Sequence, residues 1–166
     1  MSFTFPDLPA DWELVPNDAA RNEEKAASEL LWRQIPPHNF DHTVGQPGAA
    51  AFGPQSSDAR KPSFSLSSKV SAQAARDWHN ANARSTSVGV WSCSVTEVYD
   101  AGSQVVDDSK IPSEPDVEQS PGHVFVDYRD LKKADKNLLQ ATLLMKALAR
   151  GEIITSPRRV SESRAD

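Results

Sequence analysis

The sequence of 166 residues contains one cysteine, Cys93, so no disulfide can form within the chain. No apolar stretch approaches the length that spans a membrane. The first residues lack the basic start and the apolar run of a secretory signal. These absences lead us to expect a cytoplasmic protein with no membrane contact.

Several motifs that mark catalytic or binding sites are also absent. The sequence has no phosphate-binding loop, no Gly-x-Gly-x-x-Gly motif, no Cys-x-x-Cys pair and no Gly-x-Ser-x-Gly elbow. His38, Asp41 and His42 lie close together, but they follow a Pro-Pro pair, which disfavours the helix that would align the histidines. We therefore expect no metal site there. Cys93 lies among apolar residues of a predicted strand, which favours a buried, unreactive thiol.

The composition is typical of one globular domain. Hydrophobic residues make up 38% of the chain and charged residues 25%, which separates it from disordered sequences. Twelve prolines predict long, irregular loops, and a net charge of −5 argues against general nucleic-acid binding. We expect an extended arm over residues 1–16, a domain over residues 17–156 and a disordered tail over residues 157–166.

The order of elements predicts an α+β fold with a compact, mostly antiparallel sheet and packed helices. Hydrophobic periodicity predicts strands at residues 30–35, 63–67, 88–99, 104–106 and 123–128. It also predicts helices at residues 19–29, 71–83 and 134–150, the last with Gly151 as its C-terminal cap. A short strand is expected at residues 49–52 within a long loop. The expected buried stripe of the last helix comprises Leu138, Ala141, Leu144, Met145 and Leu148, widened by Leu139 and Leu143.

Three segments occur in an order that resembles ADP-ribosyltransferase-like domains, including the RES type of toxin systems. The first is Leu-Leu-Trp-Arg, ending at Arg33, and the second is Ser-Phe-Ser-Leu-Ser, from Ser63, leading into an alanine-rich helix. The third places Asp116 and Glu118 shortly before a Pro-Gly pair and a strand. The chain also resembles small bacterial proteins of uncharacterised function that share Trp-Arg-Gln and Ala-Phe-x-Pro-x-x-x-Asp stretches.

The resemblance implies a protein that binds NAD and cleaves it or transfers ADP-ribose. Arg33 would bind the pyrophosphate through its fork of donors, with Ser63 and Asp116 beside it. Ser65 would position the ribose. Glu118 would stabilise the positive charge that grows on the sugar as nicotinamide leaves.

Two alternatives stay open beside this hypothesis. In the first, Arg33 and the serines occupy ordinary strand-end and capping positions and have no catalytic role. In the second, the chain is an interaction protein, such as an antitoxin, an immunity protein or a phage-related accessory factor. Its binding surface would be the acidic segment 107–118, because clustered acids steer association with a basic partner. That segment holds five acids, Asp107, Asp108, Glu114, Asp116 and Glu118, against one base, Lys110.

Overall fold

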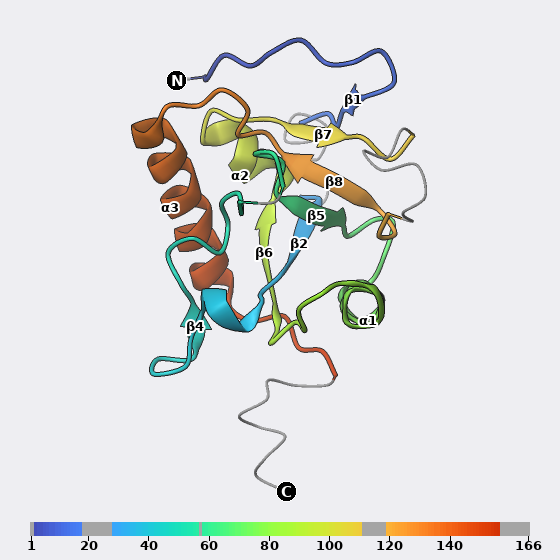
Figure 1. The fold of residues 1–166 in the computed structure, drawn as a ribbon, viewed down its shortest axis with the longest axis vertical. Helices are drawn as coiled ribbons and strands as arrows, with labels where there is room; N and C mark the ends of the chain where they lie inside the picture. Colours follow the sequence, from blue (N-terminus) through green and yellow to red (C-terminus); the bar gives the residue numbers. More distant parts are fainter. Residues whose placement is uncertain (1, 18–27, 57, 111–118, 157–166) are drawn as a thin grey trace, which may run out of the picture.

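The computed structural model describes residues 2–17, 28–56, 58–110 and 119–156, and it confirms the α+β class. A six-stranded sheet has the order β1-β7-β8-β5-β2-β6, with antiparallel neighbours throughout (Figure 1). Its strands are β1 (Glu13–Leu14), β2 (Leu30–Gln34), β5 (Ser63–Leu66), β6 (Val90–Ser94), β7 (Val105–Asp107) and β8 (His123–Val126). A separate hairpin pairs β3 (Phe40–Asp41) with β4 (Gln46–Pro47), after a 3-10 turn at Pro37–Asn39.

The described residues also form three α-helices: α1 (Ala72–Asn82), α2 (Val95–Asp100) and α3 (Lys133–Arg150). Ser71 caps α1, because its hydroxyl accepts a hydrogen bond from the Ala74 N–H at 3.0 Å. Gly151 ends α3 with a φ of 88°, a conformation that glycine adopts without strain. In Figure 1, α3 and α1 lie on opposite sides of the sheet in the view.

The two faces of the sheet differ in chemistry because side chains alternate along each strand. Leu31, Phe64 and Val124 belong to the buried core, which also includes Leu139 and Leu143 of α3. The neighbouring positions Trp32, Ser65 and His123 are cross-strand partners on the other face. This second face is polar over the centre of the sheet, where β2, β5 and β8 meet.

The N-terminal arm covers one end of the second face. Trp12 stacks edge-on against Phe125 of β8, with ring centroids 5.4 Å apart. Phe3 and Phe5 pack against the core, and β1 extends the sheet beside β7. The arm is therefore docked on the domain through its aromatic side chains.

The strand predicted at residues 88–99 is wrong in its second half. The strand ends at Ser94, and α2 begins at the next residue. Ser94 and Glu97 form a capping box, in which each side chain accepts a hydrogen bond from the other residue's backbone N–H. This Ser-x-x-Glu signal overrides the β-propensity of Val95, Thr96 and Val98, because it satisfies N–H groups that a new helix leaves unpaired.

The short strand predicted at residues 49–52 is also wrong. The chain forms consecutive turns there, with Ala51 N–H bonded to the Gly48 carbonyl and Gly53 N–H bonded to the Ala50 carbonyl. The turns bury Phe52 completely against Phe64. The helix predicted at residues 19–29 lies mostly outside the described residues, and Ser28 and Glu29, which are described, are not helical. The predicted tail, residues 157–166, also lies outside them.

The predicted buried stripe of α3 is correct at Leu139 and Leu143 and wrong at Leu138 and Met145. Leu138 and Met145 are 60% and 70% exposed, whereas Leu139, Leu143 and Ala147 are fully buried. Both sets have helical spacing, so periodicity alone does not distinguish them. The direction in which α3 docks on β6 decides which set is buried.

Candidate functional site

A cavity of about 600 Å³ opens over the polar face of the sheet. Its lining includes Trp32 and Gln34 of β2, Ser63 and Ser65 of β5, and His123 of β8. Residues of α1 and the neighbouring loops also line it: Asp58, Ala59, Lys61, Ala75, Trp78, His79, Ala83, Asp108, Gln119 and Ser120. The volume is in the range of small-molecule sites.

Asp108, His123 and Ser63 form an unbroken hydrogen-bonded chain at this cavity. His123 Nδ1 lies 2.8 Å from Asp108 Oδ1, and His123 Nε2 lies 3.0 Å from Ser63 Oγ. Antiparallel pairing of β5 with β8 places His123 opposite Ser65, two residue pairs from Ser63 and on the same face of the sheet. Asp108 directly follows β7, the next strand beyond β8. Three neighbouring strands therefore bring these side chains together.

The hydrogen-bond partners of His123 determine which of its two ring nitrogens carries the proton in the neutral imidazole. A carboxylate only accepts hydrogen bonds, so the Nδ1–H donates to Asp108. Nε2 then carries a lone pair and accepts from the Ser63 hydroxyl. Solvent exposure rises from Asp108 through His123 to Ser63. The side chain of Asp108 is 5% exposed and that of His123 is 13% exposed, and Ser63 is an exposed residue. The reactive end of the chain thus faces the cavity.

Arg33 does not have the geometry of a phosphate clamp. Its Nε, Nη1 and Nη2 donate to the carbonyls of Ala51, Ser63 and Gly53, at 2.8, 2.8 and 3.2 Å. The side chain is 7% exposed, and its guanidinium lies 5.1 Å from the centre of the Phe64 ring. Burial lowers the pKa of Arg33, and the charge of nearby Asp58 opposes that shift. Arg33 therefore fastens the turns after β4 to β5.

The structure brings three of the five predicted site residues to one cavity. Arg33, Ser63 and Ser65 all line it, although Arg33 is committed to backbone carbonyls. Asp116 and Glu118 lie outside the described residues, so their predicted roles remain predictions. Ser63 was expected to help bind a cofactor, but its described partner is His123.

Sequence reasoning missed His123 and Asp108 as site residues. Asp108 appeared as one acid of a charged segment, and His123 as the first residue of a strand. The positions are 15 residues apart, and Ser63 is 60 residues from His123. No short sequence motif contains all three residues, so only the register of the sheet shows that Asp108, His123 and Ser63 are hydrogen-bonded to one another.

The acidic segment proposed as a binding surface is partly engaged within the domain. Asp107 lies 3.5 Å from the Lys69 ammonium and accepts hydrogen bonds from Ser109. These hydrogen bonds and the Lys69 charge outweigh desolvation and lower the pKa of Asp107. Asp108 is bonded to His123. The other three acids lie outside the described residues.

Three further polar side chains lining the cavity have buried atoms without a protein hydrogen-bond partner among the described residues. They are Gln34 at both Nε2 and Oε1, His79 at Nε2 and Gln119 at Oε1. Burial lowers the pKa of His79, against the effect of a hydrogen bond to the Ser85 backbone, so the imidazole is neutral at neutral pH. Buried polar groups normally have partners, so these atoms offer unused hydrogen-bonding capacity at the cavity lining.

Cys93 is buried, as predicted, and desolvation raises its pKa to about 12, so the thiol stays protonated and unreactive. Within the described ranges, no group of three His, Cys, Asp or Glu side chains is arranged to hold a metal ion. None of the helices in the same ranges is long and apolar enough to cross a membrane.

Comparisons with known proteins do not add a family to this description. No family model, no curated protein and no solved structure matches the chain.

Proposed function

We propose that the protein is an enzyme that uses Ser63 as a nucleophile on a small molecule bound in the cavity. The observation that carries this proposal is the Asp108–His123–Ser63 hydrogen-bonded chain, with distances of 2.8 and 3.0 Å. A serine hydroxyl is a weak nucleophile by itself, and an adjacent histidine base activates it. The same constellation of residues occurs on unrelated folds, so roles and geometry identify it rather than sequence order.

Each residue has a distinct role in this proposal. As Ser63 Oγ attacks, its proton passes to His123 Nε2. The buried Asp108 carboxylate holds the imidazole in the productive tautomer and stabilises the imidazolium that forms. Burial of Asp108 strengthens this interaction, because the local dielectric is lower than that of water.

A fluorophosphonate probe tests the nucleophile directly. We expect it to modify Ser63 of the wild-type protein, as detected by peptide mass spectrometry. Ser63→Ala should abolish the modification, and His123→Gln should slow it at least a hundredfold, because a general base contributes about 10²–10⁴-fold. Ser109→Ala is the matched control, since the exposed Ser109 hydroxyl bonds to Asp107 instead of a histidine. Equal labelling of wild type and Ser63→Ala would contradict the proposal.

A second proposal follows from the convergence of Arg33, Ser63 and Ser65 on the same cavity. The protein would then be a divergent ADP-ribosyltransferase-like protein that binds NAD and cleaves it or transfers ADP-ribose. Ser65 would position the ribose, and Glu118 would stabilise the charge that develops on it. The bonds that Arg33 makes to backbone carbonyls limit its role to shaping the cavity.

Thermal unfolding with added NAD separates the two proposals. Saturation at 100 times the dissociation constant stabilises a fold by about 2.7 kcal/mol, which is easily measured. A shift with NAD that Ser65→Ala reduces, together with an unmodified Ser63 in the probe experiment, would favour the second proposal. Labelling of Ser63 without any NAD shift would favour the first.

A further inference from the structure

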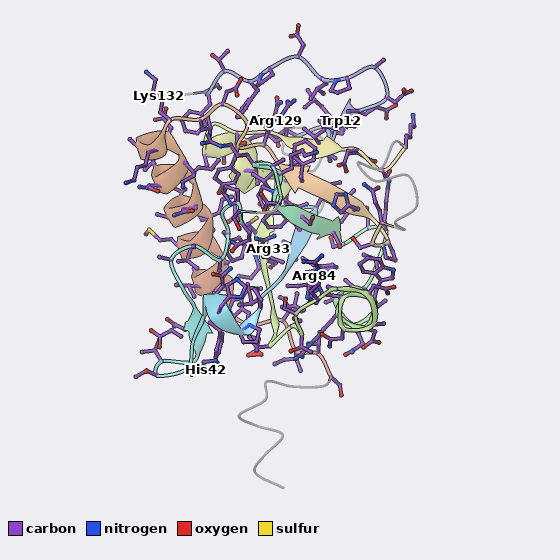
Figure 2. All side chains as sticks on the ribbon, viewed as in Figure 1. Trp12, Arg33, His42, Arg84, Arg129 and Lys132 are labelled. Carbon is purple, nitrogen blue, oxygen red and sulfur yellow. The ribbon has the colours of Figure 1, made fainter. Side chains whose placement is uncertain are left out.

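The cavity opens where β2 and β5 stop pairing. Leu31 pairs with Leu66 and Trp32 with Ser65, and these are the last paired residues of the two strands in that direction. Two residues further, the same register would bring Gln34 level with Ser63, on the same face of the sheet. There the Ser63 carbonyl accepts a hydrogen bond from Arg33 Nη1 instead. The guanidinium thus bridges β2 to β5 beyond their pairing (Figure 2 labels Arg33 near the middle of the domain).

Gln34 carries an unpaired amide in the lining of the cavity that also holds the nucleophile. Its Nε2 and Oε1 are both buried, and neither has a partner among the described residues. The amide lines the same cavity as Ser63 and His123. Leaving a buried donor unpaired costs free energy, so a donor kept in this position is suited to a group on a bound substrate.

We propose that Gln34 Nε2 donates to the oxyanion of an acyl substrate, and that this substrate is a carboxylic ester. This inference rests on the proposed role of Ser63. Nucleophilic attack on a carbonyl places a negative charge on its oxygen, and a preorganised amide N–H near that oxygen stabilises it.

The reaction balances with water as the second reactant. Ser63 Oγ bonds to the carbonyl carbon, the carbonyl π pair moves to oxygen, and the serine proton moves to His123 Nε2. Collapse of this intermediate breaks the bond to the ester oxygen, and the leaving alcohol takes the proton from His123. Water then attacks the acyl-enzyme with His123 as base, which releases the carboxylic acid and restores Ser63.

Two indole rings of the cavity suit the apolar part of an ester. Trp32 is held in place by a hydrogen bond from Nε1 to the Val70 carbonyl at 2.9 Å, and Trp78 lines the cavity from α1. Ala75 and Ala83 add small apolar surface to the α1 wall. Apolar walls with a few placed polar groups are typical of small-molecule sites.

Hydrolysis of p-nitrophenyl acetate tests the inference with the full chain. We expect turnover by the wild type, and a kcat that Gln34→Leu lowers about 10²–10³-fold while KM changes less than about threefold, because loss of one oxyanion donor has that effect. Gln34→Glu keeps the size of the side chain and removes the N–H donor, so it should lose as much even if Gln34→Leu folds poorly. Gln46→Leu, exposed on β4 and outside the cavity lining, is the matched control and should keep its rate.

Binding of phenylboronic acid separates an oxyanion donor from a purely structural Gln34. Loss of a structural side chain would not lower boronate affinity while leaving KM unchanged. The boronate forms a tetrahedral adduct with a reactive serine, so its affinity should fall at least tenfold in Gln34→Glu while KM is preserved. If Ser63 is labelled by the fluorophosphonate but the ester is not hydrolysed, or both Gln34 variants retain their rate, the inference is wrong and the nucleophile stands. If Ser63 is not labelled in the wild type, the proposed function itself fails.

Discussion

Arg33 shows how a buried cation is accommodated without becoming a ligand-binding group. Its three hydrogen bonds go to the carbonyls of Ala51, Gly53 and Ser63. These acceptors belong to two segments that follow Arg33 by 18 to 30 residues in the sequence. A planar guanidinium satisfies these acceptors together, which a single ammonium group does not. The residue thereby holds the turns around Phe52 against β5.

Replacement of Arg33 should therefore affect stability first. Hydrogen bonds to charged groups contribute about 1.5–3 kcal/mol each, so Arg33→Ala should lower the free energy of unfolding by at least about 3 kcal/mol in a urea titration. Arg33→Lys is the informative comparison, because it keeps the charge and loses the fork. We expect it to be destabilised as well, by a smaller amount. A loss below about 1 kcal/mol for the alanine variant would contradict the bracing role.

His79 should make stability depend on pH. Burial lowers the pKa of His79 below its ordinary value of 6.5, so the unfolded state binds a proton more readily than the folded state. Its contribution to stability is therefore complete above pH 6.5 and is lost as the pH falls through the lower, folded pKa. Denaturant titrations between pH 7.5 and 5 should show a smaller decline for His79→Gln than for the wild type. Identical declines would contradict this assignment.

At the scale of elements, α3 presents two rows of apolar side chains and buries one. Leu139, Leu143 and Ala147 are fully buried and belong to the core cluster. Leu138 and Met145 are largely exposed on the same helix. An apolar side chain of α3 therefore contributes much more to the free energy of unfolding when it points into the core than when it points to solvent.

Alanine substitutions in α3 should separate the two rows. Leu143→Ala should lower the free energy of unfolding by about 2–5 kcal/mol, because it removes core contacts and leaves a cavity. Met145→Ala, two residues away and 70% exposed, should change it by no more than about 0.5 kcal/mol. Guanidinium denaturation monitored by circular dichroism measures both. Equal losses would mean that the helix docks in another orientation.

The start of α2 depends on its capping box. Ser94 Oγ accepts from the Glu97 N–H at 3.0 Å, and Glu97 Oε1 accepts from the Ser94 N–H at 2.8 Å. Glu97 also forms an ion pair with Arg150 of α3 at 3.0 Å. Ser94→Ala should cost about 1 kcal/mol, whereas Ser94→Asp, which keeps a cap acceptor, should recover part of that loss in the same thermal unfolding assay. An alanine variant as stable as the wild type would show that the cap is dispensable.

At the scale of the whole molecule, the segment after α3 returns to the sheet. Ile153 bridges to Val90 of β6, and the Thr155 hydroxyl accepts a hydrogen bond from buried Arg76 of α1 at 2.8 Å. The segment thus fastens α1, one wall of the cavity, to the edge of the sheet. The residues after Ser156 are expected to contribute little to stability, because Pro157-Arg158-Arg159 and the following positions offer no apolar face.

Two truncations distinguish these parts of the C-terminus. A chain ending at Ser156 should keep its melting temperature, as the polar composition of the remaining residues predicts. A chain ending at Gly151 loses the contacts of Ile153 and Thr155, and a loss of about 2 kcal/mol would lower the melting temperature by roughly 4–8 °C. Differential scanning calorimetry of both chains gives the comparison. A large drop for the first truncation would show that residues beyond Ser156 also stabilise the fold.

Local sequence patterns determined the α+β class and most of the elements. Alternation of polar and apolar residues predicted β5, helical periodicity predicted α1, and Gly151 predicted the end of α3. These features depend on neighbours within a few residues, where propensity and capping act directly. The one local signal that was overlooked, the capping box at Ser94, was also present in the sequence.

Tertiary structure decided the buried face of α3 and the composition of the candidate site. Either apolar row of α3 satisfies helical periodicity, and docking on β6 selects Leu139 and Leu143. Ser63, His123 and Asp108 come from β5, β8 and the end of β7, and their contact depends on antiparallel register between segments far apart in sequence. A shift of one residue in that register would turn these side chains to the opposite face. Composition and periodicity do not contain that information, because register is set by pairing across the whole sheet.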